Sequence, residues 1–396
     1  MNDLLTNLTV LSLEQATTLP FLTLRLAFEG MRVIRLEHPK RGDPNRWVGP
    51  VVLDEEGMNA YFFPNNVGKQ AITLNLQTDQ GRTILHRLIA DLPVDIFCTN
   101  QLARSYEKLG IDYETLRAIK PDLIWLGITG FGPKSDEAAY DPMLQARSGL
   151  MGMTGEADGP PMLSGLPLAD IGSGEHGFGQ IMKALYRRAL TGQGSRVDIS
   201  MFQSVVSWMV SPLMLATSLG VEIERQGNTH RFFAPASAFE TQDGYVYLAV
   251  GNDRQWQAIT ALPGFEGLAR EGYRTNAGRI ADVERLNAAL AAIFCMRLAD
   301  ELTAAFRSIG VPVSRVKGVR DVEQDPYLRA NVVTARDPRS GLEVHLPPPS
   351  VTPFLQAAGL RMSFPPRLGE HNAEIYGDVL GYDAAQLADL NAREVI

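Results

Sequence analysis

Strand-like and helix-like segments alternate over the first 130 residues, and this alternation constrains the fold more than any other feature of the sequence. The strand-like apolar runs fall at 8–13, 32–37, 94–98 and 123–128, and segments with helical periodicity lie between them at 21–29, 81–92 and 106–119. Such alternation predicts an α/β fold in which an open parallel sheet carries helices on both faces.

The loops that follow the strands are the expected ligand-binding segments. In an open parallel sheet, ligands bind at the carboxyl ends of the strands, where these loops lie. The corresponding segments are 14–20, 38–47, 99–104 and 129–140.

The character of the chain changes near residue 227. A strand-like alternation covers 245–250, and helical segments continue to about residue 309. We therefore expect a large domain whose first part is 1–222, a smaller α+β domain at 223–320, and a return to the large domain at 321–396.

Composition excludes several classes of protein. The 396 residues are 45% hydrophobic and 21% charged, with a net charge of −8 that argues against a nucleic-acid surface. Charges interrupt every apolar run, so no membrane span is expected, and no signal peptide is evident at the N-terminus. Two cysteines, Cys98 and Cys295, lie in apolar runs and are expected to be buried. Their scarcity fits a cytoplasmic protein.

Asp170 is the strongest candidate for a reactive residue. It precedes an apolar stripe at helical spacing, so we expect it just before a helix, where backbone N–H groups and the helix dipole favour an ionised carboxylate. Such a carboxylate can act as a nucleophile on an activated acyl group. The plain alternative is an ordinary helix cap, which these residues alone favour.

Three glycines after Asp170 raise an alternative function. Gly172, Gly174 and Gly177 form a G-x-G-x-x-G pattern, and Asp198 follows where a dinucleotide-binding fold places its ribose-binding acid. Gly165 and Pro167 spoil the strand that this pattern requires. A nicotinamide-dependent dehydrogenase is therefore a minor alternative.

Cations on the second loop are candidate phosphate ligands. Lys40, Arg41 and Arg46 lie on one turn-rich segment, and arginine matches phosphate geometry through paired hydrogen bonds. The alternative is a solvated loop. The six histidines are scattered and pair with no cysteine or carboxylate at ligand spacing, so we expect no metal.

Taken together, several segments in order resemble the family III CoA transferases, the formyl-CoA and carnitine-CoA transferase family. They are Val10–Gln15 with Pro20, Val33–Glu37 with Gly42–Arg46, Tyr113–Ile119, Ile128–Gly132, Asp170, Gly194–Ser200, Val250–Arg254, Leu368–His371 and Leu380–Tyr382. The resemblance covers essentially the whole chain.

The resemblance implies a fold, an assembly and a mechanism. It implies a Rossmann-like large domain, a small domain and an interlocked homodimer. Asp170 would attack the thioester of an acyl-CoA to give a mixed anhydride, and CoA would then form an aspartyl-CoA thioester. Coenzyme A would be part of the substrate, and no cofactor would be permanently bound.

The resemblance and the loop positions together give a set of CoA- and acyl-binding candidates. They are Gln15, Ala16, Thr17, Pro39, Lys40, Arg46, Leu74, Asn75, Thr99, Asn100, Arg104, Lys134, Tyr140, Gly251 and Asn252.

Two alternatives within the same fold stay open. An α-methylacyl-CoA racemase would share the aspartate but typically carries a histidine where this chain has Tyr140. Tyrosine, with a pKa near 10, is a poor proton shuttle at neutral pH, which favours the transferase. An inactive CoA-binding partner subunit is the non-enzymatic alternative, since Gly251-Asn252-Asp253 is poor in glycine.

The pattern looks closest to the branch that handles short dicarboxylates, including mesaconyl-CoA C1–C4 transferase. Succinyl-, malyl-, itaconyl-, citramalyl- and mesaconyl-CoA are the candidate substrates. Arg46, Arg147 and Arg231 are candidate partners for a distal carboxylate.

Overall fold

The computed structural model describes residues 4–351 and 353–396. These residues form two compact units: the first comprises 4–149, 164–214, 326–351 and 353–396, and the second 150–163 and 215–325. Residues 150–163 group with the second unit, whereas the sequence pattern assigns them to the large domain. The chain thus leaves the first unit twice, once before and once after the segment that carries Asp170.

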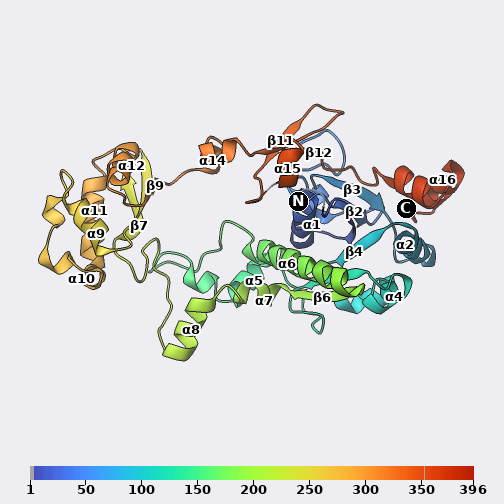
Figure 1. Cartoon of the computed structure of the whole chain (residues 1–396), viewed down its shortest axis with the longest axis horizontal. Helices are drawn as coiled ribbons and strands as arrows, with labels where there is room; N and C mark the ends of the chain where they lie inside the picture. The colour runs from blue at the N-terminus through green and yellow to red at the C-terminus, as the bar shows by residue number, and fades with distance from the viewer. Residues whose placement is uncertain (1–3, 352) are drawn as a thin grey trace. The chain divides into compact units, whose positions relative to one another are not determined.

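A parallel sheet of six strands organises the described part of the first unit (Figure 1). Its order is β3-β2-β1-β4-β5-β6, and every neighbouring pair is parallel. The strands are β1 (Thr9–Leu13), β2 (Arg32–Glu37), β3 (Lys69–Thr73), β4 (Val94–Thr99), β5 (Ile124–Thr129) and β6 (Ser195–Ser200). Chain order reverses between β1 and β4, which is where this class of sheet binds its ligands.

Helices cover both faces of this sheet. The helices of the first unit are α1 (Thr18–Phe28), α2 (Asp79–Asp91), α3 (Tyr106–Leu109), α4 (Tyr113–Ile119), α5 (Asp141–Arg147), α6 (Leu168–Thr191), α7 (Met201–Val206), α14 (Pro326–Arg329), α15 (Pro353–Ala357) and α16 (Ala384–Ala392). Leu85 on α2, Leu116 on α4 and Leu390 on α16 belong to one buried cluster with Leu11 and Ile34 of the sheet. On the other face, α1 and α6 pack against each other (Figure 1).

The second unit has its own sheet and its own hydrophobic cluster. Strands β7 (Ala236–Thr241), β8 (Gly244–Ala249) and β9 (Val313–Arg315) pair antiparallel in the order β7-β8-β9. Its helices are α9 (Asp253–Thr260), α10 (Asn276–Ala281), α11 (Val283–Phe294), α12 (Ala299–Ser308) and α13 (Val319–Val322). Helix α8 (Val210–Leu219) crosses the boundary between the units. A further small sheet in the first unit joins β10 (Val333–Arg336), β11 (Glu343–Leu346) and β12 (Arg361–Ser363).

Three local predictions need correction. Strand β3 lies between the runs at 32–37 and 94–98, where the sequence pattern predicts no strand. The helix expected at 106–119 is two helices, because Gly110 adopts a left-handed conformation (φ +66°) that ends α3. Cys295 is exposed at the end of α11, whereas Cys98 is buried in β4 as expected.

Candidate active site

Asp170 lies inside the first turn of α6. The helix begins at Leu168, so Asp170 is its third residue and the expectation that it precedes the helix is wrong. The cap comes instead from α5: the Asp141 carboxylate accepts hydrogen bonds from the backbone N–H groups of Ala169 (2.6 Å) and Asp170 (3.2 Å). Gln145 donates to the other Asp141 oxygen at 2.7 Å. Helix α5 therefore fixes the start of the helix that carries Asp170.

The Asp170 carboxylate has an environment suited to a nucleophile. Burial raises its pKa to about 6, a hydrogen bond from the Thr18 hydroxyl to Oδ1 opposes that shift, and the nearby Asp141 charge adds to it. At neutral pH the group is still mostly ionised, but it has lost much of its hydration. Among the described residues, the Oδ2 oxygen has no hydrogen-bond partner. One oxygen is thus held while the other is available to react.

Glycines let α1 approach α6 closely enough for the Thr18–Asp170 contact. A Cβ added to Gly174 would lie 2.7 Å from the Phe21 ring, and one added to Gly177 would lie 3.0 Å from Leu22. Gly172 packs in the same way against Trp208. All three lie within α6, after its first turn, and none lies on a loop between a strand and a helix. The G-x-G-x-x-G pattern is therefore a helix-packing feature, which removes the basis of the dehydrogenase alternative.

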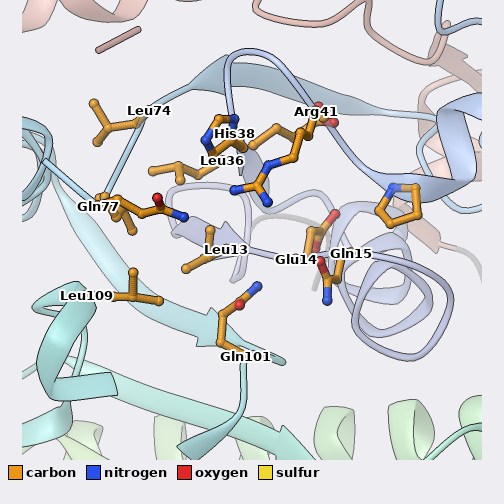
Figure 2. Close-up of a pocket in the computed structure, with 14 residues that line it drawn as sticks. Leu13, Glu14, Gln15, Leu36, His38, Arg41, Leu74, Gln77, Gln101 and Leu109 are labelled. Carbon is orange, nitrogen blue, oxygen red and sulfur yellow. The ribbon is translucent and has the colours of Figure 1, made fainter. Parts of the chain in front are cut away.

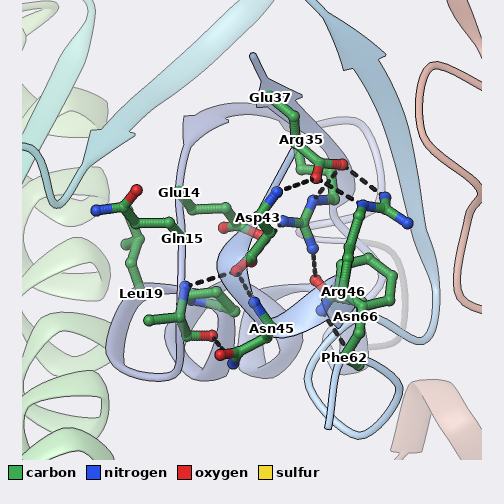
Figure 3. Close-up of polar contacts among 12 residues, drawn as sticks. Glu14, Gln15, Leu19, Arg35, Glu37, Asp43, Asn45, Arg46, Phe62 and Asn66 are labelled. Carbon is green, nitrogen blue, oxygen red and sulfur yellow. Dashed lines mark hydrogen bonds and ion pairs between the residues drawn. The ribbon is translucent and has the colours of Figure 1, made fainter. Parts of the chain in front are cut away.

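A buried network of ion pairs lies beneath the loop after β2 (Figure 3). Arg35 pairs with Asp43 at 2.8 Å, and Arg46 pairs with Glu37 at 2.6 Å. Lys69, at the start of β3, pairs with Glu14 at 2.8 Å. All six side chains are inaccessible to solvent, so three acids balance three bases in the interior.

The network corrects the prediction for Arg46. Its side chain is 0% exposed and its Nε and Nη2 donate to Glu37. Arg46 therefore faces the interior, where it cannot bind a phosphate or a substrate carboxylate. Its role is to hold the loop from within. Lys40 and Arg41 remain at the surface of the same loop, with Lys40 paired to Glu394 at 2.5 Å.

A cavity of about 370 Å³ opens at the carboxyl ends of β1, β2, β3 and β4 (Figure 2). Its lining combines leucines with polar side chains: Leu13, Leu36, Leu74, Leu76 and Leu109, with Glu14, Gln15, Glu37, His38, Arg41, Gln77 and Gln101. Burial and the Arg41 and Lys40 charges lower the pKa of His38, which favours its neutral form. Leucine side chains together with the Arg41 cation can accommodate a flat nucleobase that carries a phosphate.

A second hollow of about 390 Å³ gathers two other predicted residues. Arg104 and Lys134 line it together with Tyr106, Asp112 and Arg196. Arg104 and Lys134 are both exposed cations. They come from the loops after β4 and β5, so the sheet brings together residues that lie 30 positions apart.

Asn100 has a structural role in the site. Its side chain accepts a hydrogen bond from the Gln15 N–H at 3.2 Å and donates to the Gln15 carbonyl at 2.8 Å. This pair ties the loop after β4 to the loop after β1. Gln15 is consequently held at the edge of the cavity, with its side chain exposed.

The remaining candidates lie in varied positions. Thr99 is fully buried, and its hydroxyl accepts from Gln101 N. Asn75 donates to the Glu394 carbonyl. Tyr140 is 72% exposed immediately before α5. Pro39 and Thr17 are partly exposed.

Gly251 and Asn252 belong to the second unit, where Asn252 caps α9. Of the arginines suggested for a distal carboxylate, Arg147 pairs with Glu137 at 2.5 Å, and Arg231 donates to the carbonyls of Glu222 and Glu224.

The sequence interpretation misses the three side chains that fix Asp170. They are Thr18, Asp141 and Gln145, and none of them is among the candidates that the sequence patterns supply. Each lies 25 or more positions from Asp170, so no local spacing connects them. An Asp-Pro pair at 141–142 is a helix-start signal, but it indicates the start of α5 and says nothing of α6.

Two kinds of feature are absent from the described residues. Within 4–351 and 353–396 there is no group of three or more His, Cys, Asp or Glu side chains placed to hold a metal ion. No helix in the same ranges combines the length and apolar character that crossing a bilayer requires.

The fold and the site define a class: an α/β protein with a largely buried carboxylate at the start of a helix and a cavity at the carboxyl ends of its parallel strands. Comparison with known proteins identifies the family. The sequence model of CoA-transferase family III matches residues 5–372, and the chain belongs to this family. It is a CoA transferase, and coenzyme A is a substrate of this family.

Relatives cover nearly the full chain. A succinate–glutarate CoA-transferase of Agrobacterium fabrum is 32% identical over 95% of each chain. A succinyl-CoA:mesaconate CoA-transferase of Haloarcula marismortui is 33% identical over 96% of this chain and 97% of its own. A crystal structure of a CAIB/BAIF family protein from Brucella suis superimposes with a TM-score of 0.84 at 34% identity, covering 96% of this chain and all of that one.

Proposed function

We propose that this CoA transferase moves CoA between short dicarboxylic acids through a covalent aspartyl-CoA thioester on Asp170. The observation that carries the proposal is the Asp170 carboxylate itself. It is desolvated and mostly ionised, it is held through Oδ1 by Thr18, and Oδ2 is left to react.

Each step exchanges one acyl bond for another. The Asp170 carboxylate attacks the thioester carbonyl of the donor, forming a mixed anhydride and releasing CoA as its thiolate. The thiolate attacks the aspartyl carbonyl of the anhydride, so the donor acid leaves as a carboxylate and CoA is bound to Asp170. An acceptor carboxylate then repeats both steps in reverse, which restores Asp170 and yields a new acyl-CoA.

The leucine-lined cavity at the ends of β1–β4 is the proposed site of the CoA nucleotide. Its leucine side chains fit the adenine ring, and the Arg41 guanidinium fits a phosphate. Arg104 and Lys134 are proposed as further phosphate ligands. The loop 14–18 supports this arrangement because it runs from Gln15 at the cavity to Thr18 at the Asp170 carboxylate.

The dicarboxylate assignment is supported by what the relatives act on. The two transferases named above use succinate with glutarate and succinyl-CoA with mesaconate. Since Arg46 is buried, the proposed partner of a distal carboxylate is Arg147 or Arg231. With mesaconyl-CoA, the acceptor would be the second carboxylate of the same substrate, which makes the transfer intramolecular.

A homodimer is proposed as the working assembly. Helix α8 carries Val210, Leu213, Met214 and Leu219, and all four side chains are exposed. Exposed apolar side chains gathered on one helix are typical of a protein–protein interface, and a second copy of the chain is the proposed partner.

The test is exchange of CoA between acids. We expect ping-pong kinetics with succinyl-CoA as the donor and mesaconate, glutarate, itaconate or citramalate as the acceptor, and no transfer by Asp170→Ala. Sequential kinetics, or transfer that survives in the variant, would disprove the covalent route. Exchange of the substrate α-proton with solvent, without any acceptor acid, would instead identify a racemase.

A further inference from the structure

Ala16 has a backbone conformation that its side chain disfavours. Its φ of +62° lies in the left-handed region, and in the described part of the chain Leu360 and Glu394 are the other non-glycine residues with positive φ. A Cβ makes this region unfavourable, so surrounding contacts must hold the residue there. Ala16 lies on the loop between β1 and α1, two residues before Thr18.

Two buried side chains from the loop after β2 hold both polar groups of the Ala16 backbone. The Asp43 carboxylate accepts from Ala16 N at 3.0 Å, and the Asn45 side-chain amide donates to Ala16 O at 2.8 Å. Asp43 is 1% exposed and Asn45 is 7% exposed. We refer to these two residues as the Ala16 clamp.

The clamp is itself fixed by the interior charges (Figure 3). The same Asp43 oxygen that binds Ala16 N also accepts from Asn45 N at 2.9 Å, and the other oxygen pairs with Arg35. The Asp43 N–H donates to Glu37, which also binds Arg46. The ion-pair network therefore fixes the clamp to strand β2.

The geometry of the loop transmits this restraint to the carboxylate. The direction of the chain at Ala16 decides where α1 begins, and α1 begins at Thr18, whose hydroxyl contacts Asp170 Oδ1. Because α1 and α6 meet through the small Gly174, a shift at the start of α1 moves Thr18 relative to Asp170.

We propose that Asp43 and Asn45 are positioning residues for acyl transfer, acting through the left-handed Ala16 to hold Thr18 on the Asp170 carboxylate. This inference rests on the proposed function, since it requires Asp170 to be the reacting group. Neither Asp43 nor Asn45 touches Asp170.

The test is a double-mutant cycle on Asn45 and Ala16. Asn45→Leu removes the amide donor with little change in size, and we expect kcat to fall by roughly 10- to 100-fold. The Kd for CoA should change far less. In an Ala16→Gly background, the factor by which Asn45→Leu lowers kcat should be smaller by at least about fivefold, because glycine adopts positive φ without help. A structural role without positioning would not give this coupling.

Asn276→Leu is the matched control. Asn276 donates to the Phe232 carbonyl at 2.8 Å and accepts from Ala234 N, so in the second unit one side chain makes the two kinds of backbone contact that Asn45 and Asp43 divide between them. The unfolding midpoint and the kcat of the Asn276→Leu variant show how much activity is lost through destabilisation alone. We expect Asn45→Leu to lose far more kcat than Asn276→Leu at an equal loss of stability.

The outcomes separate this inference from the proposed function. If wild type transfers CoA and Asp170→Ala does not, a normal kcat in Asn45→Leu overturns the clamp alone. An equal loss of kcat on Asn45→Leu in the wild-type and Ala16→Gly backgrounds also overturns it. If wild type and Asp170→Ala behave alike, the proposed function fails and the inference fails with it.

Discussion

Thr18 offers the most direct control over Asp170 at the scale of single residues. Its hydroxyl donates to Asp170 Oδ1 and lowers the pKa of the carboxyl group against the effect of burial. Replacement by valine keeps the shape of the side chain and removes the donor.

For Thr18→Val we expect a higher Asp170 pKa and a kcat reduced roughly tenfold. This is the lower end of the loss in kcat expected when a hydrogen bond that orients a reacting group is removed. The pH–rate profile of kcat/KM measures the first effect and kcat the second. Thr83→Val is the control, because Thr83 donates only to the Asp79 carbonyl of its own helix. An unchanged profile in Thr18→Val would show that the hydroxyl does not tune the carboxylate.

The raised pKa of Asp170 predicts how activity depends on pH. With a pKa of about 6, kcat/KM should rise about tenfold per pH unit below 6 and level off above about 7, as the nucleophilic carboxylate forms. An acidic limb near the ordinary aspartate value of 3.8 would contradict the burial argument.

The same shift predicts a cost in stability. The unfolded chain ionises Asp170 near pH 3.8, whereas the folded chain does so near 6, so folding is penalised as pH rises between these values and the penalty is complete above 6. Asp170→Asn should therefore be more stable than wild type at pH 8, by up to about 3 kcal/mol, and gain little at pH 4. Denaturant unfolding at both pH values measures the difference.

At the scale of elements, the α1–α6 contact depends on glycine at one position. A Cβ at residue 174 would lie 2.7 Å from the Phe21 ring and 3.3 Å from the Thr18 carbonyl. Gly174→Ala should destabilise the fold by about 1–3 kcal/mol and lower kcat, since the helices must separate at Thr18.

Gly179→Ala is the matched control on the same helix. No atom lies within 4 Å of the added Cβ, so helix propensity alone should stabilise this variant by up to about 1 kcal/mol. Thermal unfolding compares the two variants. If both behave alike, close packing between α1 and α6 does not hold Thr18 in place.

Periodicity could predict the elements that local residues determine. The runs at 32–37 and 94–98 match β2 and β4 closely, because each contains buried apolar residues: Val33, Ile34 and Leu36 in β2, and Val94, Ile96 and Phe97 in β4. Strand β3 could not be found in this way. It begins with Lys69 and Gln70, and its lysine is accommodated in the interior only because Glu14 lies opposite it.

Sequence patterns supply candidates for the site in the same way. Asp170 is a candidate because it lies next to the start of a helix with an apolar stripe, and Gln15 because it follows a predicted strand. The prediction for Arg46 was wrong, since a charged residue on a loop is usually exposed and only the folded chain places it on Glu37. Thr18, Asp141 and Asn45 act through partners that are distant in the sequence, so only the fold reveals them.

At the scale of the whole molecule, one short loop runs from the cavity at the ends of β1–β4 to the side chain that binds the Asp170 carboxylate. Gln15 lies at the cavity and Thr18 at Asp170, while Ala16 between them is held by the interior charge network. This continuity, together with membership of CoA-transferase family III, gives Asp170 its central place in the account.

The measurement that tests this claim most directly is the intact mass of the protein after brief incubation with succinyl-CoA or mesaconyl-CoA. Wild type should gain one CoA, located on the peptide that contains Asp170 and removed by hydroxylamine, whereas Asp170→Ala should gain none. A wild-type protein that turns over substrate without any such adduct, or an adduct that persists in Asp170→Ala, would contradict the account.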